Sequence, residues 1–285
     1  MAAENVTSLV VGTGDFVYEI VRPWGTLPAG RVFGLISHVA VDSRDRVYFY
    51  QRTDPPVLVF DREGNFLTGW GDGRLRDAHG IYVGPDDHLY VCNRDEHEVL
   101  KVTTDGRIVL ALGTRGRPRL QAPFNHPADV AVAPNGDIYV ADGYGNSAVH
   151  RFSADGKHLS SWGTPGAGRG QFTTPHGIWV DANDRVLVAD RENNRVQLFS
   201  PEGDPYGEWS DLYHPMDIYV DRAGTVYVTD QIPRITMYAP DGRMLARGRP
   251  AAYGAHGVWG DSRGDLYLAE MNLNQVTKLV RRPAP

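Results

Sequence analysis

Six versions of one unit recur along the 285-residue chain, and this repeat limits the folds open to it. Each version contains a short apolar strand, a polar turn with Asp or Gly, and a strand of the form Y-V-x-D. A strand of the form x-V-x-x-F and a last strand that often ends in W-G follow. A repeat of about 40 to 50 residues built from four short strands is typical of a propeller blade. The copies begin at Ser37, His79, Ala128, His176, Met216 and His256.

The two ends of the chain complement each other. The sixth copy ends at "QVTKLVRR" after three strands, and "DFVYEIVRPWG" (residues 15–25) resembles the last strand of other copies, such as "GNFLTGWG" (residues 64–71). The N-terminal strand is therefore predicted to complete the last blade beside residues 275–280, which leaves no open sheet edge. We predict an all-β, six-bladed β-propeller that forms a single domain over residues 1–285.

Composition excludes several classes of function. The formal net charge is −6, and no block rich in Lys or Arg marks a nucleic-acid surface. The single cysteine, Cys92, excludes an intramolecular disulfide and suits a reducing compartment. The first residues lack the basic and apolar segments of a secretion signal, and no apolar run of 18 residues occurs. We expect a soluble, cytoplasmic protein that binds neither nucleic acid nor membranes.

One position at the start of each blade separates odd from even copies. It lies two residues before the apolar residue that anchors the first strand, and it is histidine only in blades 2, 4 and 6, at His79, His176 and His256. First strands line the channel of a propeller, and alternate blades of six are a third of a turn apart, so these imidazoles are expected to converge on the axis. Three histidines with an open position are typical of catalytic zinc, and imidazole also suits iron, nickel or copper.

A single histidine at a strand start is usually a hydrogen-bonded structural residue. Three at one position in alternate blades favour a metal site instead. The remaining histidines are interpreted differently. We expect structural roles for His38, His126 and His214, and solvated positions on turns or outer strands for His88, His97, His150 and His158.

Cationic and phenolic side chains follow the Y-V-x-D strands of the first four blades. They are Arg52, Arg94, Tyr144 and Arg191. Solvated arginine is the usual explanation, but loops at this point can face the axial mouth. Several arginines and a tyrosine around a metal would suit a small anionic substrate and proton transfer. Whether Arg94 joins the site is left open by the sequence.

These motifs resemble the NHL-repeat family and, within it, the catalytic domain of the peptidyl-α-hydroxyglycine α-amidating lyases. The likeness covers most of the chain and is sharpest in "HPADVAVAPNGDIYVADGYGNS", "GQFTTPHGIWV" and "VADRENNRVQLF". The resemblance implies cleavage of an N-acyl-α-hydroxyglycine into a primary amide and glyoxylate. It also implies zinc on His79, His176 and His256, with Tyr144, Arg52 and Arg191 as catalytic residues.

The sequence departs from that family at the third histidine. The family's structural calcium takes an aspartate directly after this histidine, where the present chain has Gly257. The carbonyls of Ile36 and Ile81 match the other calcium contacts, but carbonyls without a carboxylate make a weak site, so no tightly held calcium is expected. A family methionine nearby corresponds to Gly254, which predicts a differently shaped pocket.

Two other classes of function remain open at this point. The same three histidines would serve a metal-dependent hydrolase or hydratase acting on another small molecule. NHL propellers also act as non-enzymatic modules that bind proteins. Metal analysis separates the enzymes from the binding module, and product analysis separates the two enzymes. The oligomeric state is not indicated by the sequence.

Overall fold

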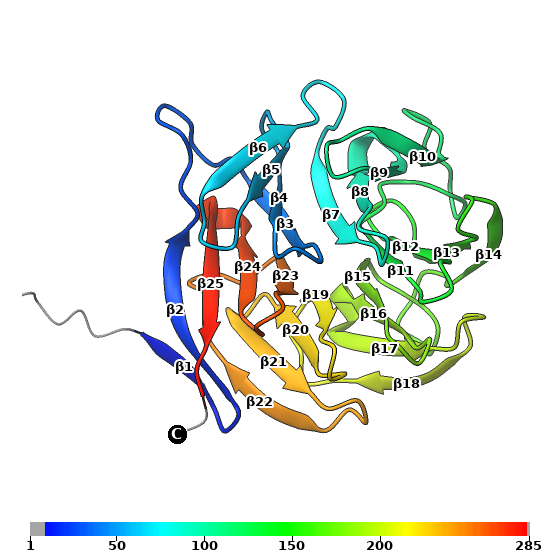
Figure 1. The fold of residues 1–285 in the computed structure, drawn as a ribbon. Helices are drawn as coiled ribbons and strands as arrows, with labels where there is room; N and C mark the ends of the chain where they lie inside the picture. The colour runs from blue at the N-terminus through cyan, green and yellow to red at the C-terminus, as the bar shows by residue number, and fades with distance from the viewer. Residues whose placement is uncertain (1–8, 284–285) are drawn as a thin grey trace, which may run out of the picture.

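Six antiparallel sheets surround a central axis in the computed structural model, which describes residues 9–283 (Figure 1). The first strand of each sheet is innermost. These strands, β3, β7, β11, β15, β19 and β23, contact one another in turn around the axis, and β23 contacts β3 to close the ring. The predicted six-bladed propeller is confirmed.

The strands of the first three blades run outward from the axis in chain order. Blade 1 contains β3 (Ile36–Val41), β4 (Val47–Gln51), β5 (Val57–Phe60) and β6 (Phe66–Trp70). Blade 2 contains β7 (Ala78–Val83), β8 (Leu89–Asn93), β9 (Glu98–Val102) and β10 (Ile108–Gly113). Blade 3 contains β11 (Asp129–Val132), β12 (Ile138–Asp142), β13 (Ala148–Phe152) and β14 (His158–Trp162).

Blades 4 and 5 repeat this order, whereas blade 6 is built from both ends of the chain. Blade 4 contains β15 (Pro175–Val180), β16 (Val186–Asp190), β17 (Arg195–Phe199) and β18 (Pro205–Trp209). Blade 5 contains β19 (Pro215–Val220), β20 (Val226–Asp230), β21 (Arg234–Tyr238) and β22 (Met244–Gly248). Blade 6 contains β23 (Gly257–Gly260), β24 (Leu266–Glu270), β25 (Gln275–Arg281), β2 (Phe16–Trp24) and β1 (Val10–Thr13).

The helices of the described chain are three single 3-10 turns that follow second strands. They are η1 (Arg94–Glu96), η2 (Arg191–Asn193) and η3 (Met271–Leu273). Two of them begin at arginines that the sequence placed near the axial mouth. None of the helices in residues 9–283 has the length and apolarity needed to cross a membrane.

An aspartate shapes the hairpin between the first and second strands of four blades. In blade 4, Asp181 Oδ1 accepts the backbone N–H groups of Asn183 at 2.9 Å and Arg185 at 3.0 Å. Such a side-chain bond to the backbone two residues on is the reason that Asp is favoured in turns. The same contacts recur at Asp42, Asp221 and Asp261. Because turn geometry sets hairpin register, equivalent residues of these blades lie at equivalent heights along the axis.

The core lies between neighbouring sheets and is made mainly of side chains from the first three strands of each blade. Tyr48, Tyr139 and Tyr267 occupy equivalent positions of their second strands and are almost fully buried. Cys92 is buried in β8 at the position that Ala141 holds in β12, so it serves as a small core residue.

The N-terminal segment closes the ring as predicted. β2 lies beside β25 and pairs with it in antiparallel register (Figure 1). Ile20 lies opposite Leu279, and Tyr18 and Trp24 are buried. The sequence did not predict β1, which pairs with the outer edge of β2 and lies against β22 of blade 5. The closing segment is therefore a hairpin that also contacts the neighbouring blade.

Deletion of residues 1–25 is expected to destabilise the protein and to cause aggregation. It exposes the edge of β25 and removes Trp24 from the core, and loss of a buried Trp side chain alone costs about 3–5 kcal/mol. Thermal unfolding and light scattering would measure both effects. Deletion of residues 1–8 keeps every described strand and serves as the control. A monomeric 1–25 deletion that melts at the wild-type temperature would contradict closure by this segment.

Candidate metal centre

Three imidazoles meet on the axis at one end of the channel. His79 lies in β7, His176 lies in β15, and His256 directly precedes β23. Each pair of rings has its centroids 4.8 Å apart, and the three interplanar angles are 69°, 70° and 71°. All three side chains are buried, and one possible ligand atom from each lies within 4.8 Å of the others. The structure thus brings the three predicted ligands together in nearly threefold symmetry.

Backbone carbonyls of the odd blades orient these rings. The Nδ1 atom of His79 lies 2.6 Å from the Ala128 carbonyl oxygen, and that of His176 lies 2.7 Å from the Met216 carbonyl oxygen. The Nδ1 atom of His256 lies 2.7 Å from the Ser37 carbonyl oxygen. A carbonyl only accepts, so each Nδ1 carries the proton. Each Nε2 then offers a lone pair, in the arrangement common for metal-binding histidine.

Burial keeps the three imidazoles uncharged. It lowers the pKa values of His79 and His176 well below the usual range and lowers the pKa of His256 to about 3. The positive charges of nearby arginines and of His38 lower these pKa values further. Metals bind the neutral imidazole, so the site is in its ligating form at neutral pH.

The chemistry of this donor set fits a transition metal better than it fits a packed core. The Tyr144 hydroxyl lies 3.0 Å from His79 Nε2 and 3.1 Å from His176 Nε2. A hydroxyl has one proton and can donate to only one of these nitrogens. With Nδ1 as the donor on every ring, the remaining lone pairs face one another, and a buried acceptor without a donor is costly. A cation between the three Nε2 atoms removes this conflict.

Tyr144 stands between the histidines and two arginines. Its loop follows β12, and Arg191 Nη1 donates to its hydroxyl at 3.1 Å. The Arg191 guanidinium lies 5.3 Å from the centre of the Tyr144 ring, and that of Arg94 lies 4.7 Å away. The ring is 37% exposed, so it borders both the buried cluster and solvent. Arg94, which the sequence left open, therefore belongs to the same constellation.

Arg52 is held in a different way. Its Nε lies 3.0 Å from Asp77 Oδ1 and donates to the Ala78 carbonyl at 3.2 Å. Asp77 also forms an ion pair with Arg94, and Arg191 pairs with Glu192 at 2.8 Å. Arg94 Nε also lies 3.2 Å from Asp95 Oδ1, so three guanidinium groups and three carboxylates lie at the mouth. The sequence analysis missed Asp77, which directly precedes the Ala78-His79 pair and is the shared partner of two predicted site residues.

Two histidines do not occupy the solvated positions that were predicted. His150 is fully buried, with Nε2 3.2 Å from Asp142 Oδ2 and Nδ1 2.7 Å from Ser161 Oγ. His97 is also buried, and its Nδ1 accepts the backbone N–H of His126 at 3.1 Å. The prediction was wrong because the loop before blade 3 folds over these outer positions, with Phe124 packed 5.6 Å from the His150 ring.

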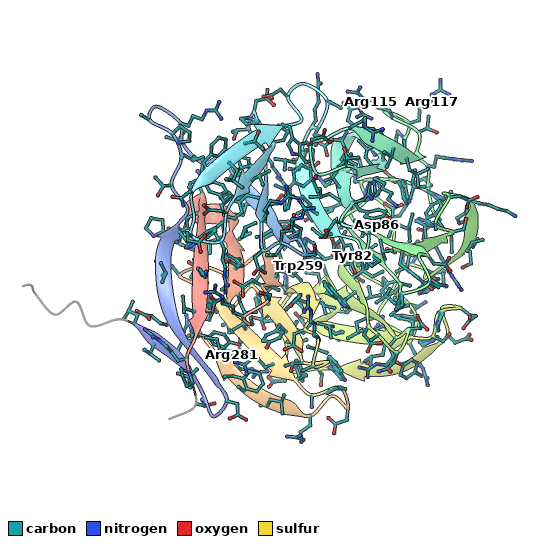
Figure 2. The ribbon with its side chains drawn as sticks, in the orientation of Figure 1. Tyr82, Asp86, Arg115, Arg117, Trp259 and Arg281 are labelled. Carbon is teal, nitrogen blue, oxygen red and sulfur yellow. The ribbon has the colours of Figure 1, made fainter. Side chains whose placement is uncertain are left out.

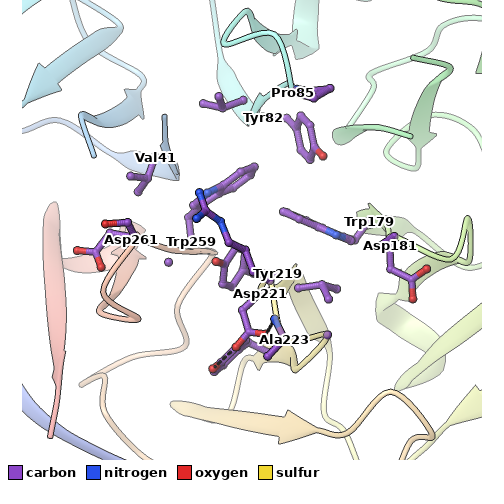
Figure 3. A pocket seen from close by; sticks show the side chains of 18 of the residues that line it. Val41, Tyr82, Pro85, Trp179, Asp181, Tyr219, Asp221, Ala223, Trp259 and Asp261 are labelled. Carbon is purple, nitrogen blue, oxygen red and sulfur yellow. Dashed lines mark hydrogen bonds between the residues drawn. The ribbon is translucent and has the colours of Figure 1, made fainter. Parts of the chain in front are cut away.

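An aromatic layer closes the axis at its other end. Tyr82, Trp179 and Trp259 each lie three residues after one of the three histidines, roughly 10 Å further along the channel. Their ring centroids are between 4.9 and 5.2 Å apart. Tyr82 and Trp259 lie near the centre of the ring in Figure 2. A bowl of about 820 Å³ opens beyond them (Figure 3). The layer separates the bowl from the histidines, so Tyr144 marks the mouth that leads to them.

The fold and the repeats define the class of this protein. The family model described as "NHL repeat" matches residues 124–152 and 172–199. The chain is a six-bladed β-propeller built from NHL repeats. Within that class it resembles proteins named peptidyl-alpha-hydroxyglycine alpha-amidating lyase and peptidylglycine alpha-amidating monooxygenase.

Three comparisons illustrate these similarities. The chain is 32% identical to human NHL repeat-containing protein 3 over 73% of its own length and 60% of that protein. It is 32% identical to peptidyl-alpha-hydroxyglycine alpha-amidating lyase 1 of Drosophila melanogaster over 53% of its own length and 30% of that protein. A gluconolactonase structure from Xanthomonas campestris superposes with a TM-score of 0.70, covering 94% of this chain and 90% of that chain, at 15% identity. The last likeness concerns the fold alone.

Proposed function

We propose that the chain is a metal-dependent lyase that cleaves the C–N bond of an N-(1-hydroxyalkyl) amide, such as an N-acyl-α-hydroxyglycine. The products are a primary amide and an aldehyde such as glyoxylate. The observation that carries this proposal is the Tyr144 hydroxyl within hydrogen-bond distance of two of three converging, neutral imidazoles. The similarity to a lyase named for this chemistry supports it.

The metal proposed for His79, His176 and His256 is zinc. Three imidazoles with an open fourth position suit catalytic zinc, although iron and other transition metals also accept imidazole. Zinc bound there would supply Lewis-acid polarisation of the substrate hydroxyl. The carbonyls of Ala128, Met216 and Ser37 keep the ligand nitrogens aimed at that point.

Tyr144 is the proposed proton-transfer group. In its phenolate form, Tyr144 would take the proton of the substrate hydroxyl and then pass that proton to the nitrogen of the leaving amide. The O–H electron pair becomes the new C=O bond while the C–N bond breaks, so neither an oxidant nor a reductant is required. Arg191 donates to the same phenolic oxygen and would stabilise the phenolate form that this role requires.

The arginines are proposed to bind the carboxylate of an anionic substrate. Three guanidinium groups lie at the mouth, and two of them, Arg52 and Arg94, share the carboxylate of Asp77. Arg191 and Arg94 flank the Tyr144 ring. Arg52 forms an ion pair with Asp77, which partly neutralises its charge. A guanidinium–carboxylate contact is charge-assisted, so it orients the substrate as well as attracting it.

Incubation of the zinc-loaded protein with an N-acyl-α-hydroxyglycine is expected to release glyoxylate and the primary amide in equal amounts. An N-(hydroxymethyl) amide, which lacks the carboxylate, is expected to bind more weakly because it makes no contact with the arginines. Chromatography of both products measures the reaction, and chelator-treated protein is the control. A fully zinc-loaded protein that leaves these compounds at their spontaneous rate of breakdown would rule the proposal out.

A further inference from the structure

A second layer of buried polar side chains lies next to the three histidines along the axis. His38, Asp129 and Asp217 come from blades 1, 3 and 5, and their polar atoms lie within 4.8 Å of one another. Each directly follows a residue whose carbonyl orients one of the three imidazoles. The two layers therefore share three peptide units. The carbonyl of each unit is directed to the three histidines, and the side chain of the following residue belongs to the second layer.

Glycines in the even blades make room for this layer. Gly80, Gly177 and Gly257 follow the three histidines, so even blades read His-Gly where odd blades place a polar side chain. A Cβ atom on Gly80 would lie 2.4 Å from Asp129 Oδ1, and one on Gly177 would lie 2.9 Å from Asp217 Cα. A Cβ atom on Gly257 would lie 2.9 Å from His38 Cγ. The space that an aspartate at position 257 would need is thus occupied by His38.

The two carboxylates tie odd blades to the strands that carry metal-binding histidines. Asp129 Oδ2 accepts the backbone N–H of Ile178 at 3.0 Å, two residues after His176. Asp217 Oδ2 accepts the backbone N–H of Val258 at 2.7 Å, two residues after His256. Each bond crosses from one blade to the next at the height of the cluster.

His38 supplies the positive charge of the layer. Its Nε2 lies 3.0 Å from Asp217 Oδ2, and its Nδ1 lies 3.0 Å from the Val39 carbonyl oxygen. The Asp217 carboxylate beside Nε2 favours the doubly protonated imidazolium. Burial acts to lower the pKa of His38, but Asp217 outweighs this and raises the pKa to about 9. The imidazolium balances one of the two buried carboxylates from within the chain, and burial raises the pKa of the other, Asp129, to about 7.

We infer that His38, Asp129 and Asp217 are positioning residues for the three-histidine centre. By locking the inner strands together, they hold the carbonyls of Ser37, Ala128 and Met216 where these orient the imidazoles. This inference rests on the proposed metal centre. Outer-shell partners of metal-binding histidine typically change metal affinity by about 10–100-fold, so the effect is measurable without any assay of turnover.

The test compares Asp217→Ala with Asp217→Asn in the full-length protein loaded with Co²⁺ and titrated with a chelator. Alanine removes the acceptor for Val258 N–H and for His38, so Co²⁺ affinity is expected to fall about 10–100-fold. Asparagine keeps an acceptor oxygen and is expected to retain most of the affinity. Asp129→Ala provides a second variant, with the same expected loss, where Asp217→Ala does not fold.

His150→Gln is the matched control, because it removes a buried His–Asp pair of 3.2 Å in blade 3, away from the axis. It is expected to lower the melting temperature and to leave Co²⁺ affinity unchanged. Wild-type affinity in both alanine variants, or equal losses in Asp217→Ala and His150→Gln, would overturn the inference while the metal centre stands. A second Co²⁺ equivalent lost only in the alanine variants would also overturn it, since the layer would then be an ion site. A wild-type protein that binds no Co²⁺ would overturn the metal centre and the inference together.

Discussion

Replacement of His176 by alanine is expected to lower transition-metal affinity by more than about 100-fold, which exceeds the range for outer-shell partners alone. The imidazole supplies one of three converging Nε2 atoms, and two ligands cannot hold the ion in the same geometry. Removal of this neutral, buried ring leaves the fold intact. Metal content per chain after gel filtration, with circular dichroism to verify folding, measures the effect.

His126→Ala is the control for that substitution, because His126 lies outside the cluster and contacts Asn125. It is expected to keep the wild-type metal content. The double variant His176→Ala/His256→Ala is the strictest form of the test, since one possible ligand of the cluster remains. Full metal retention in the double variant would show that the ion binds elsewhere.

Tyr144→Phe is expected to lower turnover by about 10²–10⁴-fold, the usual contribution of a general acid–base group. The substitution keeps the ring that Arg94 and Arg191 contact and removes only the hydroxyl. Metal content and KM are therefore expected to change little. Separate measurement of kcat and KM for glyoxylate release distinguishes proton transfer from binding.

Two outcomes would count against this role for Tyr144. A raised KM with an unchanged kcat would indicate that the hydroxyl binds substrate without moving a proton. A loss of metal from Tyr144→Phe would indicate that the hydroxyl, at 3.0 Å and 3.1 Å from two Nε2 atoms, serves the metal site itself.

The propeller was predictable because its signals are local and repeated. The hairpin turn of four blades needs only an Asp and the four residues after it. The pattern of strands recurs in all six copies. The closing strand was predictable because residues 16–24 repeat the pattern of a last strand. β1 was not predictable in this way, because it pairs once, outside the repeat, with β2.

The site was partly predictable for the same reason. Equivalent positions of a repeat lie at one height around the axis, so histidine in alternate blades implies convergence. Arg52 and Arg94 pair with Asp77 because of the conformations that their extended side chains adopt in the loops. The spacing of residues in the sequence does not determine these conformations. The second polar layer did have a signal in the sequence. In even blades the metal-binding histidine is followed by glycine, whereas in odd blades the residue at the glycine position is His or Asp.

Elemental analysis of the purified protein, joined to anomalous scattering from its crystals, tests the central claim most directly. The account predicts about one transition-metal ion per chain, with its anomalous peak on the propeller axis between the Nε2 atoms of His79, His176 and His256. A protein that remains metal-free after incubation with zinc, or a peak located away from these three nitrogens, would contradict it.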